Sequence, residues 1–182
     1  MPKSVVDINN YAFYNCRSLT NITLSDTTNI GNYAFYNCYR LSIQIPETIE
    51  SFGTSVFSSC NLLSNIKIPN NITDIPNNTF EYCYLLSNII LSNNITTIGS
   101  YAFSGCHILS TIVIPEKVTS IGNNAFYSNY NLKEIHLLPT TVPTCGTNVF
   151  YDIPDNCIIY VPKGTLNDYK TATNWSSYAS KM

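Results

Sequence analysis

The stretch NYAFYNC occurs twice in the chain, at residues 10–16 and again, letter for letter, at residues 32–38. Its Phe then recurs at steps of 22 to 24 residues through most of the sequence, at Phe13, Phe35, Phe57, Phe80, Phe103, Phe126 and Phe150. A fixed period of this length is the signature of a repeat protein, in which each unit buries its apolar face only by stacking on its neighbours. The sequence therefore predicts a solenoid of about seven coils.

Other positions keep the same period. Three residues after the Phe stand Cys16, Cys38, Cys60, Cys83 and Cys106, until Asn129 breaks the series. Further along each repeat, two aliphatic residues alternate with an outward residue, as Ile112 and Ile114 do, which predicts a short strand. Pro often follows and ends the strand, and a Gly such as Gly122 permits a tight bend. The AFxxCxxL spacing predicts one or two turns of helix, α or 3₁₀, so the fold class is an α/β repeat.

The repeat at residues 109–132, LSTIVIPEKVTSIGNNAFYSNYNL, resembles the BspA-like leucine-rich repeat. The resemblance covers about residues 1–162 and implies a right-handed leucine-rich-repeat solenoid, with parallel strands on a concave face. It also implies a bacterial cell-surface or secreted protein, of the kind associated with attachment to host matrix proteins or other cells. The last residues resemble the closing segment of bacterial members of this family.

The two ends of the chain differ. Residues 1–162 form the predicted solenoid, and residues 163–182 are predicted to form a helical cap in which Leu166, Tyr169, Trp175 and Tyr178 cover the last coil. Aligning the first ten residues with IPEKVTSIGN at 114–123 places Met1 inside a repeat. An end coil without a cap exposes core, so we expect either a fragment of a longer protein or a partner on this end. End-to-end self-association through the uncapped N-terminal coil is one such arrangement.

Composition excludes several classes of function. Only 11% of the residues are charged, the formal net charge is −2, and the nine Lys and Arg residues form no cluster. Nucleic-acid binding needs a cationic surface, so we expect none. No apolar run approaches the roughly 18 residues of a membrane span. No secretory signal is evident, although an upstream signal would be missing from a fragment.

Catalysis, metals and cofactors are not expected. The recurring cysteines are 22 or 23 residues apart, which is not the paired spacing of zinc sites, and we expect buried free thiols. Cys145 and Cys157 lie in an irregular coil and form either a disulfide or two buried thiols. The two histidines, His107 and His136, fall on different faces in this register, so no nucleophile–base arrangement is predicted.

Two surfaces are candidates for partner binding. Outward strand residues toward the C-terminal end form a strip, which we define as Lys67, Ile90, Val113, His136 and Tyr160. Exposed apolar patches mark interaction sites, whereas parallel strands also favour β-branched residues without any ligand. The second candidate is the tyrosine set that flanks the Phe positions, at Tyr11, Tyr14, Tyr33, Tyr36, Tyr39, Tyr82, Tyr84, Tyr101, Tyr127, Tyr130 and Tyr151. These tyrosines either contact a partner or only cover the side of the solenoid that is predicted to be helical.

The sequence thus favours a non-catalytic module that binds a protein partner, for example a host matrix or cell-surface protein, over an extended face. The alternative is a structural spacer that displays another domain and has no ligand of its own.

Overall fold

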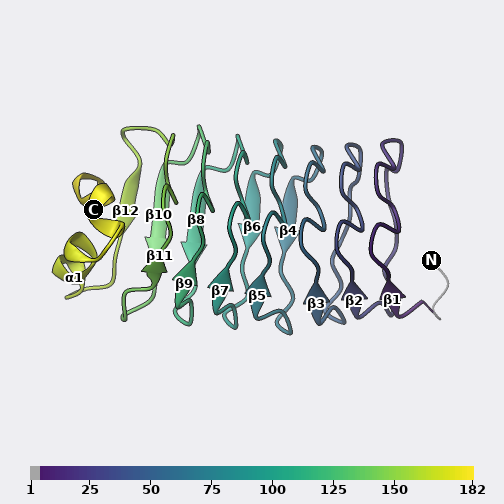
Figure 1. Cartoon of the computed structure of the whole chain (residues 1–182), viewed down its shortest axis with the longest axis horizontal. Helices are drawn as coiled ribbons and strands as arrows, with labels where there is room; N and C mark the ends of the chain where they lie inside the picture. Colours follow the sequence, from purple (N-terminus) through teal and green to yellow (C-terminus); the bar gives the residue numbers. More distant parts are fainter. Residues whose placement is uncertain (1–4) are drawn as a thin grey trace.

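The computed structural model describes residues 5–182 and is a stack of similar coils closed at its C-terminal end by two short helices (Figure 1). The predicted parallel-strand solenoid is confirmed. Its right-handed winding stays a prediction, and the predicted strand end at Met1 lies outside the described residues.

Each coil contributes to one or both of two rows of strands. The first row comprises β1 (Asp7–Ile8), β2 (Asn29–Ile30), β3 (Ser51–Phe52), β5 (Asp74–Ile75), β7 (Thr97–Ile98), β9 (Ser120–Ile121) and β11 (Thr144–Cys145). The second row comprises β4 (Asn65–Lys67), β6 (Asn88–Ile90), β8 (Thr111–Ile114), β10 (Glu134–Leu137) and β12 (Ile158–Tyr160). Every pairing within the described rows is parallel, so equivalent residues of successive coils lie side by side.

The alternation in the sequence predicts only the second row. The first row lies just before the Gly at which the sequence predicts a bend, and its residues pair in register from coil to coil, as Ile98 does with Ile121. Conversely, strands expected around Ile22 and Ile43 are reduced to an isolated bridge between Asn21 and Ser42. The second repeat is one residue shorter after Leu41, which disturbs the strand register at that point.

The segment around each Phe is a succession of turns, so the predicted helical turns are wrong. Two positions in each coil, two residues before and two after the Phe, have positive φ, and a helix cannot contain them. In the first coil these are Tyr11 (φ 61) and Asn15 (φ 59). Their amides donate to the next coil, Tyr11 to the Asn32 carbonyl oxygen at 2.9 Å and Asn15 to that of Tyr36 at 2.8 Å. Hydrogen bonds between coils therefore alternate with local ones, such as that from the Tyr14 amide to the Tyr11 carbonyl oxygen at 3.1 Å, and no continuous helix forms.

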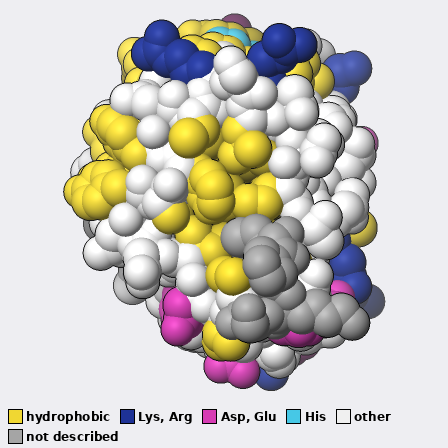
Figure 2. Space-filling model, turned by 90° about the vertical axis from the view of Figure 1, so that its right-hand side faces the viewer, with side chains coloured by type: hydrophobic (Ala, Val, Ile, Leu, Met, Phe, Trp, Pro, Cys, Tyr) yellow, Lys and Arg dark blue, Asp and Glu magenta, His cyan; other side chains and the backbone are white. Residues whose placement is uncertain are grey.

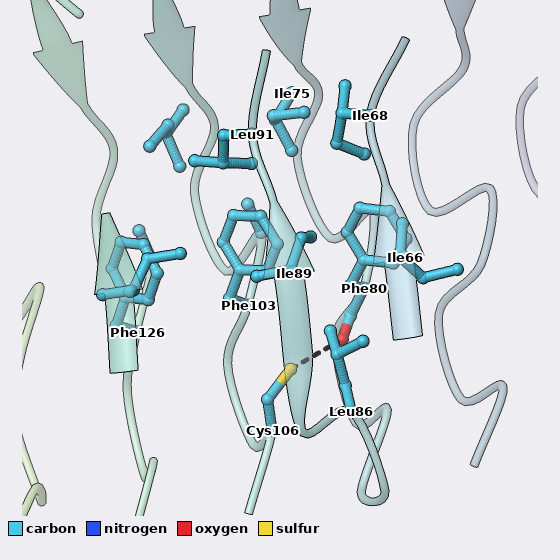
Figure 3. Packing of buried hydrophobic residues seen from close by; sticks show 14 of the residues in the cluster. Ile66, Ile68, Ile75, Phe80, Leu86, Ile89, Leu91, Phe103, Cys106 and Phe126 are labelled. Atoms are coloured by element: carbon cyan, nitrogen blue, oxygen red, sulfur yellow. Dashed lines mark hydrogen bonds between the residues drawn. The ribbon is translucent and has the colours of Figure 1, made fainter. Parts of the chain in front are cut away.

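The core consists of columns that run the length of the stack. The seven repeat phenylalanines stack with ring centroids between 5.1 and 5.7 Å apart and nearly parallel planes. Figure 3 shows Phe80, Phe103 and Phe126 in this column beside inward aliphatics such as Ile66 and Ile89. Below each Phe lies the predicted small slot: the Cys106 Sγ donates to the Phe80 carbonyl oxygen at 3.4 Å (Figure 3). The same motif thus fills the same interior position in successive coils.

Glycine is needed where coils approach closely, and not, as expected from the sequence, for a bend. A Cβ placed on Gly53 would lie 2.3 Å from the Asn32 backbone nitrogen, and one on Gly122 would lie 2.5 Å from that of Ser100. Neither glycine has a positive φ. These residues therefore let the first row of strands run directly over the backbone of the preceding coil.

The last coil is covered by α1 (Leu166–Thr171) and η1 (Trp175–Lys181). Trp175 and Tyr178 contact the Phe150 ring, with centroids 6.0 and 5.4 Å away. The Tyr169 hydroxyl is also buried and donates to the Pro139 carbonyl oxygen at 2.8 Å. Leu166, expected to cover the coil as well, is exposed. Aromatic side chains of the two helices thus continue the Phe column and end it.

Candidate interaction surfaces

Parallel register brings the predicted strip together on the outer face of the second row. Lys67 pairs with Ile90, Val113 with His136, and His136 with Tyr160, while β6 and β8 pack side by side. Ile90 is 54% exposed, Val113 45% and Tyr160 44%. Their exposure follows from the pleat, which points alternate residues away from the core. The strip is a continuous row of side chains, largely apolar beyond Lys67.

The charged and aromatic residues of the strip form ion pairs and ring contacts with neighbouring side chains. Lys67 Nζ lies 2.5 Å from Glu47 Oε1, and this hydrogen bond lowers the pKa of the Glu47 carboxyl. His136 Nε2 lies 3.0 Å from Glu134 Oε2, and the imidazole stacks on the Tyr160 ring with centroids 4.6 Å apart. These contacts order the two ends of the strip, while Ile90 and Val113 between them present bare aliphatic surface.

Two further apolar residues on this face were missed by sequence reasoning. Leu138 and Ile158 are exposed beside the strip, close to half of each side chain being accessible. Leu138 follows His136 by two residues and Ile158 precedes Tyr160 by two, so the same alternation could have found them. The structure therefore widens the strip toward the C-terminal end.

The tyrosines form ladders on the turn side. Tyr11 stacks on Tyr33 with ring centroids 5.2 Å apart and planes 2° apart, and Tyr14 stacks on Tyr36 at 5.1 Å. Tyr11 and Tyr14 are exposed, whereas Tyr33 and Tyr36 are half-buried. Stacking covers one face of each ring. The rings of these four tyrosines pack on one another, while contact of the tyrosine set with a partner stays a prediction.

A third exposed surface, also missed from the sequence, is a ridge formed by Leu62, Leu85 and Ile108. These residues occupy one repeat position in successive coils, two after the Cys, and each is at least 40% exposed. Beside them His107 stacks on Tyr84 with centroids 4.6 Å apart and contacts Tyr130 at 4.9 Å. The recurrence of an aliphatic at a fixed outward position was the available signal.

The cysteines are all free, and all but one are buried. Cys16 is exposed, contrary to expectation, because it lies on the first described coil. Cys145 and Cys157 are two buried thiols and not a disulfide. Burial raises the pKa of Cys157 to about 11 and that of Cys145 to about 12. Such thiols stay protonated at neutral pH and are poor nucleophiles.

Residues 5–182 contain no group of three or more His, Cys, Asp or Glu side chains placed to hold a metal ion. His107 contacts two tyrosines, and His136 contacts Glu134 and Tyr160. Within the described part of the chain, no helix is long and apolar enough to cross a membrane.

The family profile described as the BspA type leucine rich repeat region matches residues 1–106 and 73–173, in six copies. The chain belongs to the BspA-type leucine-rich repeat family. This confirms the resemblance seen in the repeat at residues 109–132. Leucine-rich repeat proteins are in general binding or scaffold modules without enzymatic activity.

Solved structures agree with this assignment. A leucine rich cell surface protein from Faecalibacterium prausnitzii is 34% identical, with a TM-score of 0.73, over 78% of this BspA-type chain and 38% of that one. A leucine rich repeat protein of T. pallidum is 30% identical, with a TM-score of 0.77, over 84% of this chain and 73% of that one. The chain thus spans about two fifths of the F. prausnitzii structure. A comparison with curated proteins gives no significant match.

Proposed function

We propose that this BspA-type chain is a non-catalytic, protein-binding module of a bacterial cell-surface or secreted protein, and that the strip is its partner-binding surface. One observation carries the proposal: Ile90, Val113 and Tyr160 remain about half exposed on the second row of strands, with His136 between the last two, although the fold buries the aliphatic residues beside them. A contiguous apolar surface of this kind marks interaction sites more often than scattered exposed residues do. The name of the F. prausnitzii relative supports the cell-surface location.

The mechanism is recognition by many modest contacts on a preformed surface. Parallel pairing holds the strip residues in fixed register, so binding orders few new backbone groups. Ile90 and Val113 supply the central apolar contact, and the stacked pair of His136 and Tyr160 supplies an aromatic edge with polar atoms. We propose a protein partner such as a host matrix or cell-surface protein, because an apolar centre with a polar rim fits a protein interface.

The test is binding of the purified chain to a panel of host matrix and epithelial proteins. The strip variant carries Ile90→Ser, Val113→Asp and Tyr160→Ser. The control carries Ser18→Asp and Asn167→Asp, which are exposed and lie outside the second row of strands. We expect the strip variant to lose at least about tenfold in affinity, as truncation of central interface residues does, while the control binds normally.

The outcomes separate the candidate surfaces. Binding that survives in the strip variant contradicts this site, and a ridge variant with Leu62→Ser, Leu85→Ser and Ile108→Ser then tests the other apolar surface. If no panel member binds the folded wild-type chain, the spacer hypothesis is favoured instead. Thermal unfolding of each variant checks that a lost interaction is not lost folding.

A further inference from the structure

A cavity of about 440 Å³ lies between the last turn segment of the solenoid and η1. Figure 2 shows the β1 end of the stack, where hydrophobic side chains gather at the centre. At the other end, Trp175 and Tyr178 cover the Phe column, and the cavity lies beside Tyr178 with both polar and aromatic walls. Its volume is within the range of small-ligand pockets, about 300–1,000 Å³. We call it the cap cavity.

Two backbone amides of the cap cavity have no partner. In every preceding coil, the amides of the repeat Phe and of the residues two before and two after it donate to carbonyl oxygens of the next coil. In the last coil, where η1 takes the place of another coil, the equivalent residues are Asn148, Phe150 and Asp152. Phe150 N–H donates to the Tyr178 hydroxyl at 3.1 Å, but the amides of Asn148 and Asp152 have no acceptor within residues 5–182.

Both unpartnered amides belong to residues that line the cap cavity. Asn148 and Asp152 keep the positive φ of their counterparts in the other coils, 55° and 61°. Their N–H groups therefore point the same way as those counterparts, out of the last coil and toward η1. Backbone N–H groups are strong donors that need an acceptor. A ligand in the cap cavity would meet two preformed hydrogen-bond donors on either side of the Tyr178 hydroxyl.

The cap cavity also carries acceptors and one cation. Asp152 Oδ2 accepts from the Ser128 hydroxyl at 2.9 Å, and the exposed Asp155 carboxylate lines the same wall. Lys181 Nζ donates to the carbonyl oxygens of Pro154 and Asp155, at 2.9 and 3.0 Å, and ties η1 to this wall. An anion would meet the two carboxylates, and a metal ion would meet the N–H groups and the ammonium. A neutral ligand rich in hydroxyls suits both kinds of group, because a hydroxyl donates and accepts.

An aromatic ring face completes the lining. Tyr151 lines the cap cavity and is 57% exposed. Its ring stacks on that of Tyr127, one coil back, with centroids 5.7 Å apart and planes 4° apart. Because Tyr127 covers the face turned toward the stack, the opposite face has no ring against it within residues 5–182. The face of an aromatic ring carries partial negative charge and attracts the weakly positive C–H groups of a sugar ring.

We infer that the cap cavity is a carbohydrate-binding site for a neutral sugar ring. The amides of Asn148 and Asp152 donate to sugar oxygens, the Asp155 carboxylate accepts from sugar hydroxyls, and the free face of Tyr151 stacks on the ring. Recognition is non-covalent. The site is separate from the strip and goes beyond the proposed binding of a protein partner.

The test is a titration of the ¹⁵N-labelled 182-residue chain, followed through its amide resonances by NMR. The probes are the methyl glycosides of glucose, galactose, mannose and N-acetylglucosamine, with sodium acetate and calcium chloride as anion and cation probes. We expect at least one glycoside to shift the amide resonances of Asn148 and Asp152 in a saturable way. It should also slow hydrogen exchange of both amides severalfold, because a bound acceptor protects each N–H. This measurement needs no substitution that could disturb folding.

A pair of tyrosine variants tests the stacking. Tyr151→Ala should weaken glycoside binding about tenfold, since it removes the aromatic face. The control is Tyr130→Ala, at a tyrosine that is 52% exposed and does not line the cap cavity, and it should bind as the wild type does. The inference is overturned if no glycoside moves the resonances of Asn148 and Asp152, or if only acetate or calcium moves them. Equal glycoside affinity of Tyr151→Ala and wild type also overturns it.

Discussion

At the scale of single residues, Asn129 shows what the cysteine column requires. The Cys60 Sγ donates to the Phe35 carbonyl oxygen at 3.1 Å, and this contact recurs along the column. Asn129 takes the same place and its Nδ2 donates to the Phe103 carbonyl oxygen at 3.1 Å. Its Oδ1, however, is buried without a partner. The slot therefore requires a small donor, and the asparagine adds an acceptor that the site cannot satisfy.

Restoring the column should stabilise the protein. Asn129→Cys keeps a donor toward Phe103 and removes the unpaired buried Oδ1, whose desolvation costs about 1–3 kcal/mol. It also gives up the second Nδ2 hydrogen bond, to the Phe126 carbonyl oxygen at 3.1 Å, which contributes about 1 kcal/mol. We expect the free energy of unfolding to rise by the difference, roughly 1 kcal/mol. Urea denaturation measures the change, with Asn131→Cys at an exposed position as control. A lower stability for Asn129→Cys would show that packing volume outweighs the hydrogen bond.

At the scale of elements, the turn segments and the first row of strands depend on the adjacent coils. Tyr33 and Tyr101 hold positive φ, at 56° and 57°, a conformation that costs a residue with a Cβ about 1 kcal/mol or more. Each donates its amide to the next coil, Tyr33 to Thr54 and Tyr101 to Asn123, both at 2.9 Å. The stack therefore stabilises local conformations that an isolated repeat would not adopt.

The close approach of coils at the first row of strands predicts that a larger residue at Gly53 lowers stability. Gly53→Ala should destabilise the fold by about 1–3 kcal/mol, because the new Cβ would lie 2.3 Å from the Asn32 backbone nitrogen and force the coils apart. Ser51→Ala, on the exposed side of β3, serves as control and should change stability by less than about 0.5 kcal/mol. Thermal unfolding distinguishes the two, and equal midpoints would refute the steric explanation.

At the scale of the whole molecule, each coil is stabilised by contact with its neighbours, and the C-terminal helices cover the last coil. Trp175 is fully buried, contacts the Phe150 ring and donates from Nε1 to the Pro143 carbonyl oxygen at 2.7 Å. A solenoid behaves as a one-dimensional array, in which each repeat is stabilised chiefly by its neighbours. Removal of the Trp175 contacts should therefore destabilise the nearest coils most.

Trp175→Ala should lower the unfolding free energy by about 3–5 kcal/mol. Hydrogen exchange should also become faster in residues 118–160 well before it changes in residues 30–90, because local opening begins at the uncovered end. Mass-spectrometric exchange of peptides from the two ranges makes the comparison. Uniform acceleration along the chain would mean that the solenoid unfolds as a single cooperative unit.

The sequence by itself determined the solenoid, its period and its core columns, because these follow from residue types repeated at fixed spacing. Phe103, Cys106 and Ile112 lie where their periodicity placed them, as do the strip residues Ile90 and Val113, since alternation decides which side of a strand faces out.

Only the tertiary structure decided the features that depend on contact between coils. It replaced helical turns by left-handed turns at residues such as Tyr82 (φ 57), because hydrogen bonds to the next coil outweigh local preference. It assigned Gly53 to close packing instead of bending, for a reason that lies in the backbone of Asn32 one coil away. It also left Cys16 exposed while burying Cys38, since the burial of each repeat is set by whether a neighbour covers it.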